Sequence, residues 1–84
     1  MPRKYTERNI QMNLNPYERL ANAIILQAVT DYRNARKTLK NRPKDGDAMY
    51  TTKEVIAFFR SDYFKVLTSI DPELLISKLR KEFE

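Results

Sequence analysis

The sequence predicts an all-α fold: a small three- or four-helix domain with one long N-terminal helix packed by shorter C-terminal helices. Capping residues precede several segments, and hydrophobic residues recur at helical spacing within those segments. No segments of alternating polar and apolar residues flank the Asp-Gly pair at residues 45–46, as they would in a β-hairpin. The chain has 84 residues, 42% of them hydrophobic, which is enough for one small core. We therefore expect residues 15–84 to form a single helical domain.

The first 14 residues differ from the rest, and we expect a flexible basic arm over residues 1–14. Arg3, Lys4 and Arg8 stand among apolar side chains that show no helical period. The apolar stretch over residues 10–14 gives the arm a means of folding back onto the domain.

Strong start signals predict a long first helix. Asn15 is a favourable N-cap, Pro16 suits the first helical position, and Glu18 completes a capping box. Good helix formers then continue without glycine or proline until Pro43, and the residue before a proline disfavours helix. The sequence therefore predicts one uninterrupted helix over residues 16–41.

A loop is expected over residues 42–50, where Pro43 and the Asp-Gly pair at Gly46 favour a turn. A β-hairpin is the competing interpretation of the Asp-Gly pair, but no alternating strands flank it. Thr51 and Glu54 form a second capping box. The second helix is therefore expected to begin at Thr51.

The segment over residues 52–70 fits two interpretations. One straight helix would place most of its apolar residues on a face about 120° wide, but it would leave Phe58 and Phe64 off that face. A bend with Ser61 as a new N-cap would turn both aromatic side chains inward and place Asp62 in a favourable first turn. The bend is the favoured interpretation.

A last helix is predicted near the C-terminal end of the sequence, with Asp71 as its cap and Pro72 at its first position. Its apolar face comprises Leu75, Ile76, Leu79 and Phe83. Together with residues 62–68, this helix has the gross geometry of a helix-turn-helix motif. That motif is disfavoured because Lys65 and Lys78 stand where small and apolar residues are required.

The composition excludes most catalytic chemistry. Without cysteine or histidine, the chain cannot form disulfides, Cys/His zinc sites, cysteine nucleophiles or histidine-based triads. A single glycine cannot build a P-loop or a dinucleotide-binding fingerprint. Asp45 and Asp47 supply too few oxygen ligands for a cation site, and turn chemistry explains them better. We therefore expect a non-enzymatic protein with no catalytic residues, metal, cofactor or small-molecule substrate.

The sequence favours a cytoplasmic location. No apolar run approaches the length of a membrane span, and no signal-peptide pattern opens the sequence. A membrane is therefore not among the expected partners.

Positive charge is concentrated in the first half of the chain. The chain carries 16 Lys or Arg against 11 Asp or Glu, a net charge of +5, and residues 1–41 account for the excess with eight against three. Several of these cations share one side of the long helix, and the run continues into the loop. Such a stripe can follow a phosphate backbone; an ordinary solvated face and a surface for an acidic protein are the alternatives. The candidate nucleic-acid-binding residues are Arg19, Arg33, Arg36, Lys37, Lys40, Arg42 and Lys44.

The middle of the long helix is apolar on nearly all sides, which normally means burial on all sides. One expected core seam comprises Tyr17, Ala21, Ile24, Ala28 and Tyr32. The opposite side then needs its own cover, from the basic arm or from another chain, either a partner protein or a second copy. The candidate protein-interface residues are Leu26, Val29, Ile25 and Ala23.

Three stretches carry a resemblance: residues 58–64 (Phe-Phe-Arg-Ser-Asp-Tyr-Phe), residues 69–75 (Ser-Ile-Asp-Pro-Glu-Leu-Leu) and residues 17–24. Over residues 16–83 the chain resembles short helical proteins encoded by phages and prophages of Gram-positive bacteria, most of unknown function. The resemblance implies the fold, a phage origin and a bacterial host cell. It also implies one of two roles: handling phage nucleic acid or transcription, or blocking a host defence protein such as a CRISPR nuclease.

The predicted function is binding: a small phage-type protein contacts nucleic acid, or a nucleoprotein complex, through the basic stripe on its first helix. The alternative is a protein-binding module, either an inhibitor of a CRISPR-type defence nuclease or an assembly adaptor, that uses the apolar surface of that helix. The positive net charge argues against simple mimicry of DNA but not against protein binding.

Overall fold

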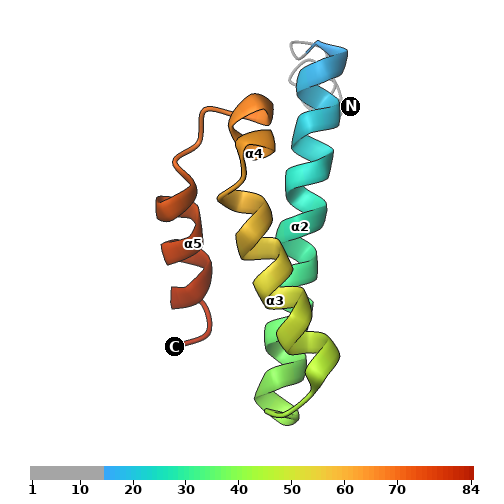
Figure 1. Cartoon of the computed structure of the whole chain (residues 1–84), viewed down its shortest axis with the longest axis vertical. Coiled ribbons are helices and arrows are strands. Elements are labelled where there is room, and N and C mark those ends of the chain that lie inside the picture. Colours follow the sequence, from blue (N-terminus) through green and yellow to red (C-terminus); the bar gives the residue numbers. More distant parts are fainter. Residues whose placement is uncertain (1–14) are drawn as a thin grey trace, which may run out of the picture.

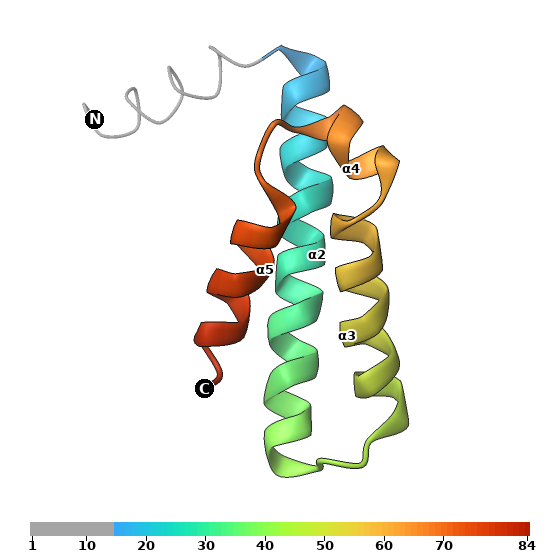
Figure 2. The same cartoon turned by 60° about the vertical axis from the view of Figure 1, so that its left-hand side comes forward.

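A computed structural model describes residues 15–84, and this part of the chain contains four helices and no strand. The helices are α2 (Pro16–Asn41), α3 (Gly46–Phe59), α4 (Asp62–Leu67) and α5 (Pro72–Lys81). The long α2 forms the spine, α3 returns antiparallel to it, and α5 runs in the direction of α2 (Figures 1 and 2). The all-α prediction, with a long helix packed by shorter ones, is confirmed. The predicted basic arm, residues 1–14, lies outside the described residues.

The first helix has the predicted bounds and runs without interruption. Asn15 Oδ1 accepts a hydrogen bond from the backbone N–H of Glu18 at 2.8 Å, and the Asn15 side-chain amide donates to the Glu18 carboxylate at 2.7 Å. At the other end, the Arg42 N–H donates to the Thr38 carbonyl at 2.7 Å, just before Pro43. No helix in residues 15–84 has an apolar stretch long enough to cross a bilayer.

The prediction that the second helix begins at Thr51 is wrong, because α3 begins five residues earlier, at Gly46. Asp45 is the N-cap, and its carboxylate accepts a hydrogen bond from the Ala48 N–H at 2.9 Å. The same Asp-Gly pair can serve a turn or a helix start. Burial of Ala48 in the extra turn favours the helix.

The predicted bend at Ser61 is confirmed. Ser61 Oγ accepts a hydrogen bond from the Phe64 N–H at 3.2 Å and donates one to the Phe58 carbonyl at 2.6 Å, so one hydroxyl ends α3 and starts α4. The bend turns Phe64 fully into the core, where its ring meets those of Phe58 and Phe59 edge-on at 5.7 and 5.4 Å. Edge-to-face contacts of this kind add to the burial of the rings.

The last helix is tied to the rest of the fold at both ends. Asp71 caps α5 by accepting from the Glu73 N–H at 2.9 Å, as its Asp-Pro start predicts. Arg60 in turn donates two hydrogen bonds, of 2.8 and 2.9 Å, to the Glu73 carboxylate. Just beyond α5, the Glu82 carboxylate accepts two hydrogen bonds from Arg33 of α2, at 2.9 and 2.8 Å.

The core gathers one face of α2 with side chains from all three shorter helices. Its buried members are Ile25, Val29, Tyr32, Val55, Phe59, Phe64, Ile76 and Leu79. The predicted seam is therefore partly wrong: Tyr17 is 85% exposed and Ile24 is only half-buried, while Ile25 is buried. Because this part of α2 is apolar nearly all round, periodicity alone could not identify the face that meets the other helices.

Acid is expected to weaken the attachment of α5. The hydrogen bonds from Arg60 and Arg33 hold the pKa values of Glu73 and Glu82 below their ordinary value of 4.5. Their contribution to the free energy of unfolding is therefore complete above 4.5 and is lost as pH falls through the depressed pKa values.

Urea unfolding at neutral pH and at about pH 3 measures this effect. We expect the wild type to lose more stability on acidification than a Glu73→Gln/Glu82→Gln variant, which lacks both titrating carboxylates. Equal losses in the two proteins would contradict the linkage.

Candidate nucleic-acid interface

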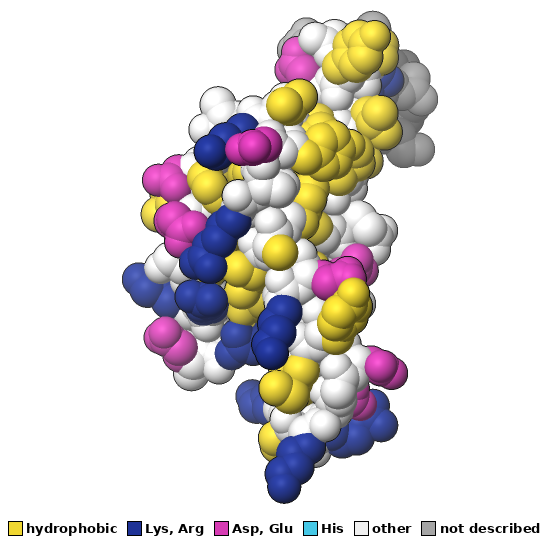
Figure 3. Space-filling view, viewed as in Figure 1, with side chains coloured by type: hydrophobic (Ala, Val, Ile, Leu, Met, Phe, Trp, Pro, Cys, Tyr) yellow, Lys and Arg dark blue, Asp and Glu magenta, His cyan; other side chains and the backbone are white. Residues whose placement is uncertain are grey.

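The two ends of one face of the described chain differ in chemical character. On the face shown in Figure 3, Lys and Arg side chains gather over α5 and the lower parts of α2 and α3. Hydrophobic side chains gather at the upper end, over α4 and the beginning of α2. The upper end is therefore mainly apolar, and the rest of this face, which we call the basic region, mixes Lys and Arg with acidic and apolar side chains.

The basic region contains a hollow of about 490 Å³ formed by three helices. Arg36 of α2, Lys53 of α3 and Arg80 of α5 each line it, and no acidic residue is among its lining residues. Three cations from elements far apart in sequence thus converge on one cavity. Its apolar lining includes Leu39, Met49 and Ile56.

A second, smaller hollow of about 190 Å³ adjoins the first. Arg36 and Leu39 line both hollows, and Lys40 and Phe83 complete the smaller one. The two hollows thus share part of their lining beside the C-terminal half of α2, and we call them together the basic groove. Its lining combines cations with the apolar side chains of Leu39, Met49 and Ile56, which we call its floor.

Arg36 is held in place by aromatic side chains. Its Nη1 donates to the Tyr32 hydroxyl at 2.6 Å, and its guanidinium carbon lies 5.6 Å from the centre of the Tyr32 ring and 5.2 Å from that of Phe83. Cation–π attraction favours this placement. The Tyr32 and Phe83 rings also meet edge-on at 6.3 Å. A cation positioned in this way loses less conformational entropy when it binds an anion.

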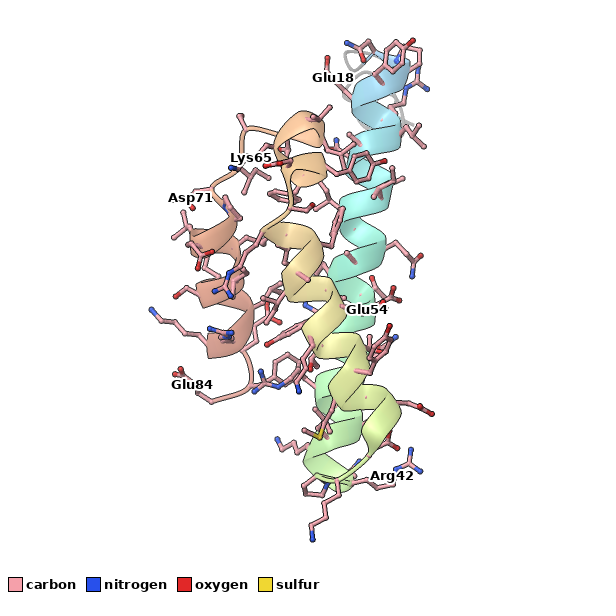
Figure 4. The ribbon with its side chains drawn as sticks, in the orientation of Figure 1. Glu18, Arg42, Glu54, Lys65, Asp71 and Glu84 are labelled. Carbon is pink, nitrogen blue, oxygen red and sulfur yellow. The ribbon has the colours of Figure 1, made fainter. Side chains whose placement is uncertain are left out.

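The fold does not keep all residues of the predicted basic stripe together as free cations. Arg33 is engaged by Glu82, which raises the Arg33 pKa through hydrogen bonds and charge, so Arg33 acts in the fold and is not a free cation. Arg42 lies 3.6 Å from Asp45, a looser pairing. Arg19 lies about 32 Å along α2 from Lys40, at 1.5 Å per residue. Figure 4 shows how far apart the two ends of α2 are, with Glu18 at one end and Arg42 at the other.

The remaining predicted cations stay together. Lys37, Lys40 and Lys44 are exposed, and no carboxylate within residues 15–84 forms an ion pair with them. Lys40 and Arg36 line the basic groove, and Lys37 lies one turn or less from each along α2.

Two functional candidates were missed from the sequence, Lys53 and Arg80. Both belong to other helices: Lys53 is the one Lys or Arg of α3, and Arg80 stands in the basic last turn of α5 with Lys78 and Lys81. Only the packing of α3 and α5 against α2 brings them beside Arg36. No signal in the sequence predicts that these side chains lie close together.

The predicted protein interface is also divided by the fold. Ile25 and Val29 are buried in the core against the shorter helices, so the prediction that they meet the arm or another chain is wrong. Leu26 is 64% exposed and Ala23 is exposed. A single exposed leucine is ordinary on a protein surface.

A more extensive apolar surface lies where the sequence did not indicate it. The start of α2 and α4 border a hollow of about 440 Å³. Its lining includes the exposed side chains of Tyr17, Leu20, Tyr63 and Val66. We call these four residues the upper apolar surface.

The fold and the site define a small all-α protein with a basic, apolar-floored groove shared by three helices. Comparison with protein-family models, with curated proteins and with solved structures finds no match for the chain. The resemblance to phage-encoded helical proteins therefore stays a prediction.

Proposed function

We propose that the protein binds nucleic acid, alone or within a nucleoprotein complex, through the basic groove and the lysines beside it. The observation that carries this proposal is the convergence of Arg36, Lys53 and Arg80 on one cavity whose lining includes no carboxylate. Phosphate groups are the natural ligands of such a cluster, because each neutralised phosphate also releases a counterion. Exposed Lys37 and Lys44 extend the positive surface beyond the groove.

Helix electrostatics do not account for this cluster. Cations are favoured in the last turn of a helix, which explains Lys40 and Arg80. Lys53 instead lies in the middle of α3, and Arg36 lies more than a turn before the end of α2. Two of the four cations that line the groove thus have no stabilising role at a helix end, and ligand binding supplies a reason for their placement.

The proposal includes a cellular setting and a mode of action. The resemblance to proteins of phages and prophages supports a phage-type protein that acts in the cytoplasm of a bacterial host. The absence of histidine and cysteine from the sequence supports a role in binding and not in catalysis.

The test is charge reversal with a charge-matched control. A Lys37→Glu/Lys40→Glu variant should bind a labelled nucleic acid more weakly than the wild type, and the salt dependence of binding should fall by about one unit of log–log slope for each lost phosphate contact. A Lys65→Glu/Lys78→Glu variant changes the net charge equally but alters neither hollow. It should retain most of the affinity. Fluorescence anisotropy measures both, with circular dichroism to confirm folding.

Equal weakening by the two variants would mean that net charge, and not this surface, attracts the ligand. Absence of wild-type binding even at low salt would end the nucleic-acid proposal. The second candidate function, binding of a partner protein, would then lead, and the upper apolar surface is the observation that favours it.

A further inference from the structure

We infer that the basic groove takes a single-stranded nucleic acid, with unpaired bases against its apolar floor, in preference to a duplex. The inference rests on the proposed function and specifies the form of its ligand. It follows from the floor of the groove, which phosphate binding alone does not require.

The floor offers apolar contact to a ligand that also carries negative charge. Leu39, Met49 and Ile56 line the larger hollow together with its cations, and Met49 is exposed. A duplex keeps its base faces stacked inside and presents base edges and phosphates, so it offers no base face to the floor. A single strand offers phosphates and base faces together. A base stacked on an aromatic ring gains about 1–3 kcal/mol, and a base placed on the aliphatic floor is likewise removed from water.

Arg36 stands at the junction of the two hollows. It and Leu39 are the residues that line both, with Lys53 and Arg80 at the larger hollow and Lys40 at the smaller. A strand that crosses this junction can place successive bases in the two hollows and the phosphate between them at Arg36. Guanidinium planes also stack on bases, and this one is already supported by the rings of Tyr32 and Phe83.

Three labelled probes of equal length, about 12 nucleotides, separate base contacts from charge. They are an oligothymidylate, a strand of the same length with abasic sites, and a duplex. The first two carry the same phosphates, so any difference between them reports the bases. We expect anisotropy to show that the oligothymidylate binds roughly 5-fold or more tightly than the abasic strand, as for at least one stacked base. We also expect it to bind more tightly than the duplex.

Two variants locate the effect in the groove. Arg36→Lys keeps the charge and removes the planar guanidinium. Met49→Ser removes apolar contact at an exposed position of the floor and spares the core. Each should weaken binding of the oligothymidylate several-fold and leave binding of the abasic strand unchanged. Met49→Ser provides the test should Arg36→Lys disturb the packing around Tyr32.

The outcomes separate this inference from the function on which it rests. Equal affinity for the oligothymidylate and the abasic strand, tighter binding of the duplex, or wild-type affinity in both variants would overturn the inference and leave nucleic-acid binding standing. No binding of any probe at low salt would overturn both. Displacement of the oligothymidylate by polyglutamate of matched charge would show that the groove prefers an acidic polypeptide, which also contradicts the inference.

Discussion

Phe59→Ala is expected to leave the chain largely unfolded in water. Phe59 is 0% exposed, and its ring contacts those of Phe58 and Phe64 at 5.7 and 5.4 Å, where α3 and α4 meet. Truncation of a buried phenylalanine costs about 3–5 kcal/mol. A domain of this size has a free energy of unfolding of about 5 kcal/mol or less, so the loss consumes most of it.

Urea unfolding followed by circular dichroism measures this loss. Val66→Ala is the matched control, since Val66 is 82% exposed on the neighbouring helix, and it should change stability by no more than about 0.5 kcal/mol. If Phe59→Ala behaved like Val66→Ala, the aromatic cluster would not be the centre of the core.

Reversal of two groove cations, Lys53→Glu and Arg80→Glu, is expected to lower nucleic-acid affinity by more than about tenfold at low salt. The change leaves one cation, Arg36, facing two carboxylates in the larger hollow, so a phosphate entering it would be repelled. The two residues lie on different helices, and their joint effect depends on the fold. The Lys65→Glu/Lys78→Glu variant again controls for net charge.

Local capping chemistry made most of the helix boundaries predictable. Asn15, Ser61 and Asp71 each accept a backbone hydrogen bond from a residue two or three positions later, so the information lies within a few residues of sequence. The start of α3 was misplaced because Asp45 stands in a sequence that also suits a turn. Ala48 in the first turn of α3 is buried, and α3 packs against α2, so tertiary packing favours the helix over the turn.

The site could be predicted only where it follows one helix. Arg36, Lys37 and Lys40 belong to the stripe read from the periodicity of α2, and they remain together. Arg33 does not belong to the site because it pairs with Glu82. That pairing could not be predicted, since Glu82 lies 49 residues away in the sequence. Lys53 and Arg80 belong to the site although the sequence did not indicate them, because tertiary packing decides which distant side chains meet.

The measurement that tests the central claim most directly is the salt dependence of single-strand binding by the wild type and by the Lys53→Glu/Arg80→Glu variant. For the wild type we predict a linear fall of log affinity with log salt, with a slope near −3, as for about four phosphates on a single strand. For the variant we predict a slope closer to zero by more than about one unit. If the wild type failed to bind at low salt, or if the two proteins gave the same slope, nucleic-acid binding at the basic groove would be contradicted.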